Sequence, residues 1–182
     1  MNAEEPLPEL IRRARRGDLD AFDSILRTQE RRVLTLAYRL MGNLPDAQDA
    51  AQEVYLRLYR QIGSFDEGRE LQPWLNRITA NVCTDLRRKR RTLVPIDSVV
   101  PVSASRTDEG LEQQEQRALV AMALGQLPAR QRAAIVLRDV EGLSTSEVAE
   151  ALNSTETTVR SQISTGRTRL KQVIGKLLGR KS

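Results

Sequence analysis

Apolar residues recur every three or four positions through most of the chain, which places them on one face of an α-helix. In the first half, this spacing predicts a helix that ends at Gly42-Asn43, a second over about 45–62, and a third that begins at Leu71. Glycine and asparagine tolerate the left-handed backbone angles that end a helix, which supports the first boundary. With a short helix near residues 8–16, the first half is expected to form a three- or four-helix unit.

The helical spacing stops at Thr92 and resumes near Leu111. Prolines and serines occupy the stretch between, where they remove backbone donors and favour turns. Residues 92–111 are therefore predicted to be a flexible linker between two domains. Four more helices are predicted, at about 111–126, 129–140, 144–152 and 155–178. The expected fold class is all-α, with two small helical domains over residues 9–91 and 112–178.

Composition excludes several classes of function. One cysteine, Cys83, and no histidine exclude a disulfide framework and an ordinary zinc site, so no metal and no cofactor are expected. Cys83 fits an inert buried thiol better than a redox sensor. No apolar run approaches the roughly 20 residues that span a membrane, and the acidic start is no signal peptide. We therefore expect a cytoplasmic protein without membrane insertion.

The strongest local pattern is a helix-turn-helix between Ser144 and Leu170. Ser144 and Glu147 have the spacing of a capping box, and Asn153 falls where the turn needs a positive φ. The second helix presents hydroxyl and guanidinium groups on its outer face, which suit phosphates and base edges in the major groove. The alternative is an ordinary helical hairpin with a polar surface. The candidate DNA contacts are Ser154, Thr155, Thr157, Thr158, Arg160, Ser161, Ser164 and Arg167. Gly166 inside this helix indicates a bend or a close contact.

In the first domain, Asp46, Asp49 and Glu53 share one face of the predicted second helix, with Gln52 beside them. No second acidic cluster and no histidine complete a metal-dependent active site, so catalysis is not expected. The face is either simply solvated or a docking surface for a basic partner.

The third helix of the first domain joins Trp74 to a basic end. The net charge of the chain is +5, and its unbroken basic run from Arg87 to Arg91 indicates a polyanionic partner or a solvated helix end. Aromatic rings beside cations suit single-stranded nucleic acid, although Trp74 by itself fits a core position better. Asp85 is expected to pair with a nearby arginine.

Three strings, in this order, resemble the extracytoplasmic-function (ECF) sigma factors of RNA polymerase: DAQDAAQEVYLRLYRQI, PWLNRITANVCTDLRRKRR and LPARQRAAIVLRDVEGLSTSEVAEALNSTETTVRSQISTGRTRL. The resemblance implies a promoter-reading subunit that is not an enzyme. Residues 9–91 would be sigma region 2 and residues 112–178 would be region 4. Expected partners are core RNA polymerase, promoter DNA in duplex and single-stranded form, and an anti-sigma factor.

The resemblance also implies roles for particular residues. Region 2 would dock on the β′ clamp helices of the polymerase through Asp46, Asp49, Gln52, Glu53, Val54 and Leu58. It would open and read the −10 element through Phe65, Trp74, Arg77, Asn81, Arg87 and Arg88. Region 4 would read the −35 element with its helix-turn-helix and contact the β flap.

The sequence departs from the family pattern at three places. Gln48 stands where the family often has glutamate, and Tyr59 where it commonly has tryptophan. Ser164-Thr165-Gly166 replaces a more basic stretch. Two other functions remain open. A stand-alone helix-turn-helix regulator accounts for residues 144–170 but leaves the basic helix of the first domain unexplained. An enzyme acting on nucleic acid would need a divalent metal for turnover.

Overall fold

The computed structural model describes residues 5–93 and 111–179, and the regular secondary structure of these residues is entirely helical, without a strand. Most of the predicted linker, residues 94–110, lies outside the described residues. Its two ends are helical, because α4 continues to Leu93 and α5 begins at Leu111. The prediction of an all-α fold is confirmed.

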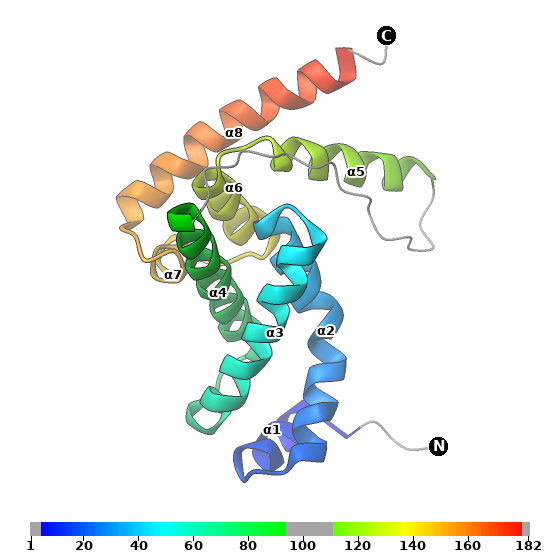
Figure 1. Ribbon diagram of the computed structural model, residues 1–182, viewed down its shortest axis with the longest axis vertical. Helices are drawn as coiled ribbons and strands as arrows, with labels where there is room; N and C mark the ends of the chain where they lie inside the picture. Colours follow the sequence, from blue (N-terminus) through cyan, green and yellow to red (C-terminus); the bar gives the residue numbers. More distant parts are fainter. Residues whose placement is uncertain (1–4, 94–110, 180–182) are drawn as a thin grey trace.

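The first domain contains the helices α1 (Leu7–Arg15), α2 (Leu19–Met41), α3 (Leu44–Gln61) and α4 (Leu71–Leu93), with a 3₁₀ turn at Ile62–Ser64. The long helix α2 contacts the other three (Figure 1). The stripes of apolar residues meet between the helices, and several of their members are fully buried: Ile25, Val33, Val54, Leu58, Leu75 and Val82. These side chains form the core predicted from the helical spacing.

Local signals set the ends of these helices. Asp18 accepts hydrogen bonds from the N–H groups of Asp20 and Ala21 at the start of α2, at 3.0 and 3.1 Å. Gly42 ends α2 with φ +89°, a conformation that glycine adopts readily. Asn43 then begins α3 by accepting the N–H of Asp46 at 2.9 Å. The sharp turn between α2 and α3 fixes the antiparallel packing of the two helices.

The second domain contains α5 (Leu111–Gly125), α6 (Ala129–Ile135), α7 (Thr145–Ala151) and α8 (Glu156–Gly179). The predicted helix over 129–140 is divided, because α6 continues as a π-helical turn at Val136–Val140. The helix α8 contacts α5, α6 and α7 (Figure 1). It approaches α6 closely at the buried Gly166, where a β-carbon would lie 2.7 Å from Ile135 Cδ1. Of the two explanations for Gly166, the structure shows the close contact.

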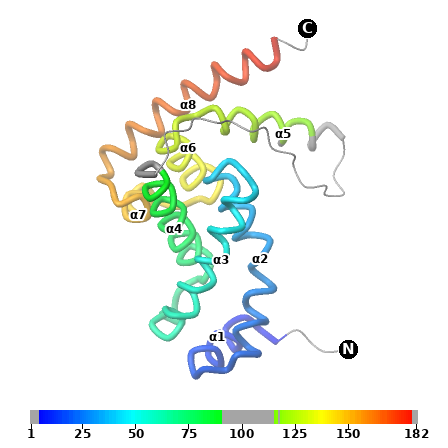
Figure 2. The backbone as a smooth tube through the Cα atoms, viewed as in Figure 1, coloured from blue at the N-terminus to red at the C-terminus, as the bar shows by residue number. Residues whose placement is uncertain are grey.

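The two domains are in contact with each other, which the sequence did not predict. Helix α4 lies against α7, and α2 lies against α6 (Figure 2). The helix with the basic end therefore faces the first helix of the predicted helix-turn-helix.

Candidate nucleic-acid interface

The pair α7–α8 has the expected helix-turn-helix construction. The Ser144 hydroxyl accepts the N–H of Glu147 at 3.2 Å, and the Glu147 carboxylate accepts the N–H of Ser144 at 2.8 Å. These bonds complete the capping box, and the hydrogen bond from the Ser144 N–H lowers the pKa of Glu147. Asn153 has φ +48° in the turn, and the Thr155 hydroxyl accepts the N–H of Thr158 at the start of α8. Both helices are thus capped by side chains, and the capping box predicted at Ser144 and Glu147 is confirmed.

The outer face of α8 is open to solvent. Seven of the eight residues predicted to contact DNA there are exposed, and Ser154 is half-buried. The two arginines on this face are already paired. Arg160 donates to Glu156 one turn earlier at 2.6 Å, and Arg167 forms two hydrogen bonds with Asp139, at 2.6 and 2.9 Å. Asp139 lies in the π-helical turn that continues α6, so its pair with Arg167 ties α8 to the end of α6.

The predicted −10 residues on and before α4 are divided between the surface and the interior. Asn81 and Arg88 are exposed. Phe65 is only 4% exposed and its ring lies 4.8 Å from that of Trp74, measured between centroids. In this conformation Phe65 lies in the core and the half-buried Trp74 packs against it, so the Phe65 ring is not accessible to nucleic acid. The structure thus favours the core role that the sequence suggested for Trp74.

Two of the α4 arginines are held by neighbouring groups. Arg77 forms an ion pair with Glu150 of α7, and Arg87 donates to the carbonyl oxygen of Leu40 at the end of α2, at 2.9 Å. Asp85 pairs with Arg57 at 3.0 Å and with Arg88 at 3.4 Å, which confirms that it has an arginine partner. The basic end of α4 is therefore partly engaged within the protein.

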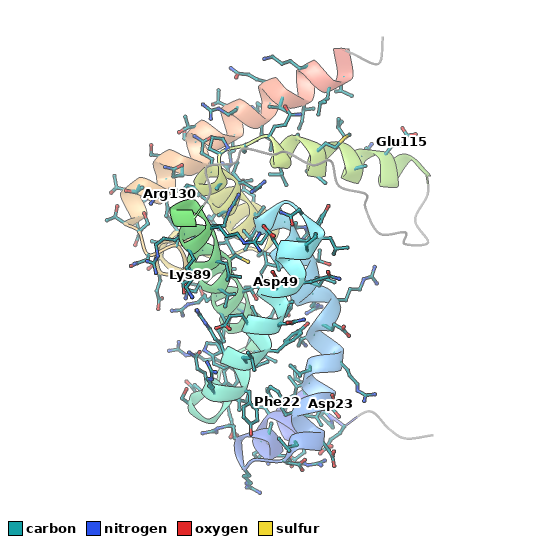
Figure 3. The ribbon with its side chains drawn as sticks, viewed as in Figure 1. Phe22, Asp23, Asp49, Lys89, Glu115 and Arg130 are labelled. Atoms are coloured by element: carbon teal, nitrogen blue, oxygen red, sulfur yellow. The ribbon has the colours of Figure 1, made fainter. Side chains whose placement is uncertain are left out.

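The acidic face of α3 consists of Asp46, Asp49, Gln52 and Glu53, and it lies on the surface with the first and last half-buried. Arg90 of α4 pairs with Asp46 and with Asp49, the latter at 3.3 Å. Figure 3 shows Asp49 on α3 and Lys89 on α4. Glu53 pairs with Arg57 at 3.2 Å, so each carboxylate of this face has an arginine partner. Asp49, whose side chain is 63% exposed, is the most accessible of the three.

Val54 and Leu58 do not belong to this face. Both have no exposed surface and pack in the core of the first domain, so they are not available to a partner in this conformation. The residues predicted to dock on a partner did not include Leu56 and Tyr59, which are about half exposed on α3. Their signal was present, since apolar residues that lie outside the buried stripe of a helix are expected at the surface.

Charged residues also join the two domains. Glu141, at the end of the π-helical turn, accepts hydrogen bonds from Arg39 of α2 at 3.0 Å and from Asn76 of α4 at 3.3 Å. Arg132 of α6 is 5% exposed, and its guanidinium lies close to Gly42. Burial, and then the positive charge of Arg87, lower the pKa of Arg132 to about 10. Arg132 therefore remains charged at neutral pH.

Nothing in the described ranges, 5–93 and 111–179, gathers three or more side chains that would hold a metal ion. Within the same ranges, no helix combines the length and the apolar composition that crossing a membrane requires. Cys83 is buried in α4, and its burial raises the pKa of the thiol to about 12. The thiol is thus protonated and unreactive at neutral pH, as the sequence suggested.

Comparisons with known proteins match both domains. Residues 25–92 match the family described as sigma-70 region 2, and residues 117–170 match sigma-70 region 4. The chain is 30% identical to the ECF RNA polymerase sigma factor SigW of Bacillus subtilis, over 93% of this chain and 97% of SigW. It is 36% identical to the ECF RNA polymerase sigma factor SigE of Mycolicibacterium smegmatis, over 87% of this chain and 63% of SigE.

A solved structure is also similar. The sigma factor RpoE of Bartonella quintana, in complex with the anti-sigma factor NepR, superimposes with a TM-score of 0.67 at 26% identity. The match covers 85% of this chain and 96% of RpoE. The similarity therefore extends over both helical domains.

Proposed function

Because this chain belongs to the ECF RNA polymerase sigma factors, we propose that its two domains divide the reading of a promoter between them. As a member of this family, the protein is a transcription initiation factor rather than an enzyme, and it directs RNA polymerase to specific promoters. The observation that carries the division of labour is the presence of two separate cationic helices, α4 and α8, one in each domain.

The second domain reads the −35 element in duplex DNA. Its capped helix-turn-helix presents the start of α8, where the positive end of the helix dipole favours phosphate. Thr157, Thr158 and Ser161 are exposed for hydrogen bonds to bases and phosphates. To contact DNA, Arg160 must break its hydrogen bond with Glu156, and Arg167 must break its hydrogen bonds with Asp139. Arg160 is the better candidate for base contact, because it has one hydrogen bond to break, with Glu156 on its own helix, whereas Arg167 has two with Asp139.

The first domain opens and reads the −10 element. Asn81 and Arg88 offer an exposed amide and a guanidinium on α4, and Arg77 and Arg87 add positive charge when they are released from their partners. Cations along such a helix neutralise phosphates, and binding of the separated strand offsets part of the free energy that strand opening costs. Phe65 supports this helix by packing against its Trp74.

The acidic face of α3 docks on core polymerase, at the β′ clamp helices. Asp49 and Gln52 are exposed, and Leu56 and Tyr59 extend the face with apolar surface. A charged rim around apolar side chains is typical of protein interfaces. The second domain would contact the β flap. We also propose a partner of the anti-sigma class, since the similar RpoE was solved with one, and a cytoplasmic location on the nucleoid, where polymerase and promoter DNA meet.

The experiment is binding to purified core polymerase, followed by run-off transcription from a library of genomic promoters. Asp49→Arg reverses a charge on the docking face and is expected to lower the affinity for core about tenfold, or about 1.4 kcal/mol. Asp23→Arg is the matched control, because Asp23 is an exposed carboxylate near the opposite end of the first domain (Figure 3).

Equal affinities for the two variants would show that α3 is not the docking face. If the unmodified protein binds duplex promoter DNA tightly without polymerase and does not bind core, the proposed roles of both domains are wrong. The protein would then be a stand-alone helix-turn-helix regulator.

A further inference from the structure

The candidate DNA contacts of the second domain include two charged residues, Arg160 and Arg167, and each is paired with a carboxylate. Residues seven positions apart lie on the same face of an α-helix, so both arginines belong to the outer face of α8. With Glu156 and Asp139 as partners, the two arginines add no net charge to this face. The pairs therefore leave little attraction for the phosphates that every DNA sequence carries.

The two ion pairs differ in strength. Arg160 makes a single hydrogen bond with Glu156 on its own helix, and the two side chains are 64% and 44% exposed. Arg167 donates from Nε and Nη2 to the two carboxylate oxygens of Asp139, at 2.9 and 2.6 Å, and Asp139 is only 30% exposed. Arginine–carboxylate pairs with two parallel hydrogen bonds are stronger and more specific in geometry than single-point pairs. Arg167 is therefore held more firmly than Arg160.

The backbone of the second domain places Asp139 beside α8. Asp139 belongs to the π-helical turn Val136–Val140, which continues α6. The buried Gly166 lets α8 approach Ile135, the last residue of α6 before this turn. Arg167 directly follows Gly166 and is exposed, so the close approach brings its guanidinium to the Asp139 carboxylate.

From this geometry we propose that Asp139 is a specificity-determining residue, which withholds Arg167 from phosphates and releases it to a guanine in the −35 element. A phosphate that replaced Asp139 as the partner of Arg167 would lie beside the freed carboxylate, and the two negative charges would repel each other. The major-groove edge of guanine offers two acceptors, O6 and N7, without a net charge. It can replace both lost hydrogen bonds without this repulsion. This inference rests on the proposed reading of the −35 element by α8.

The first test is Asp139→Asn in the full chain, with fluorescence anisotropy on a labelled duplex of random sequence. Asparagine retains the size of the side chain but offers one acceptor and no charge, so Arg167 becomes available to phosphate. One added phosphate contact should steepen the slope of log affinity against log salt by about 0.9, which is about a 3.5-fold larger loss of affinity between about 50 and 200 mM salt. Asp23→Asn is the matched control, because Asp23 pairs with Arg27 at 2.8 Å on α2, in the other domain.

The second test measures discrimination by holoenzyme assembled from the full chain and core polymerase. A promoter obtained from the run-off library is compared with the same promoter carrying a scrambled −35 element. Asp139→Asn is expected to lower the ratio of the two transcript yields about threefold, because a phosphate contact supports binding to both templates. Arg167→Lys retains the charge without the two parallel hydrogen bonds and should lower the ratio in the same direction.

The Arg167→Ala background identifies the mechanism. Without Arg167, adding Asp139→Asn should change neither the salt dependence nor the ratio of transcript yields. If the added substitution raises the affinity for random duplex as much as it does when Arg167 is present, removal of a negative charge is the cause and the inference is wrong. If Asp139→Asn lowers transcription from both templates equally, the ion pair only supports the position of α8, which also overturns the inference. Circular dichroism establishes that each variant is folded.

Arg160→Ala separates failure of this inference from failure of the proposed function. If Arg160→Ala lowers the preference of the holoenzyme for the intact −35 element and Asp139→Asn does not, only the role of Asp139 is wrong. If neither substitution changes this preference, α8 does not read the −35 element. In that case the proposed function of the second domain and the inference are both wrong.

Discussion

Replacing Gly166 by alanine tests how closely α8 approaches α6, and a second glycine in the same helix provides the control. At Gly166 a β-carbon would lie 2.7 Å from Ile135 Cδ1 and 3.2 Å from Gln131 Cβ. At Gly175, nine residues later, a β-carbon would meet no atom within 4 Å. The two substitutions change helix propensity in the same way and differ in the space available.

The magnitudes follow from this difference. Alanine gains up to about 1 kcal/mol over glycine in a helix interior, and this is the whole effect expected at Gly175. At Gly166 the gain is set against overpacking, which costs about 1–3 kcal/mol. The Cδ1 atom of Ile135 can rotate away, whereas Gln131 Cβ is fixed to the backbone of α6. We therefore expect Gly166→Ala to lower the free energy of unfolding by about 1 kcal/mol, and Gly175→Ala to raise it.

The assay is urea denaturation followed by far-ultraviolet circular dichroism, with the midpoint as the readout. Ile135→Val removes the Cδ1 atom, so it should partly rescue Gly166→Ala, with a coupling free energy of at least about 0.5 kcal/mol in the double-mutant cycle. Equal stabilisation by alanine at both glycines would refute the close approach of α8 to α6.

Two further predictions concern single side chains. Ser144→Ala removes the hydroxyl that accepts the Glu147 N–H and should lower the free energy of unfolding by about 1 kcal/mol, whereas Ser144→Thr retains the cap. Urea denaturation measures the stability of both variants. An unchanged midpoint for the alanine variant would contradict the capping box. Cys83 should react slowly with iodoacetamide at pH 8 in the native protein and rapidly in urea, because burial raises the pKa of the thiol to about 12. Mass spectrometry measures the rate of alkylation in each condition. Equal rates in the native protein and in urea would show that the thiol is exposed.

The helices could be predicted from the sequence because their signals are local. The predicted boundaries of the helix over 111–126 and of the helix-turn-helix fall within two residues of those in the structure. Ser144 with Glu147, and the positive φ at Asn153, are interactions between residues that are close in the chain. Such features depend on backbone geometry and on side chains within one helical turn.

The remaining features depend on residues that are distant in the chain. Arg39 and Glu141 are separated by 102 positions, and neither carries a local signal for the other. The burial of Phe65 depends on the packing of Trp74 beside it, and the family pattern alone placed its ring at the DNA. The π-helical turn at 136–140 has no signature in helical spacing, because it differs from an α-helix by a single residue.

The contact between α4 and α7 has a consequence for affinity that follows from covalent connection. Two domains in one chain meet at an effective concentration of about millimolar, so an interface too weak to join separate molecules is still populated within one. A contact of about millimolar intrinsic strength, worth roughly 4 kcal/mol, would be closed about half of the time. Any partner that binds the open form more tightly than this displaces the second domain by mass action. Such a partner needs no separate source of energy to separate the two domains.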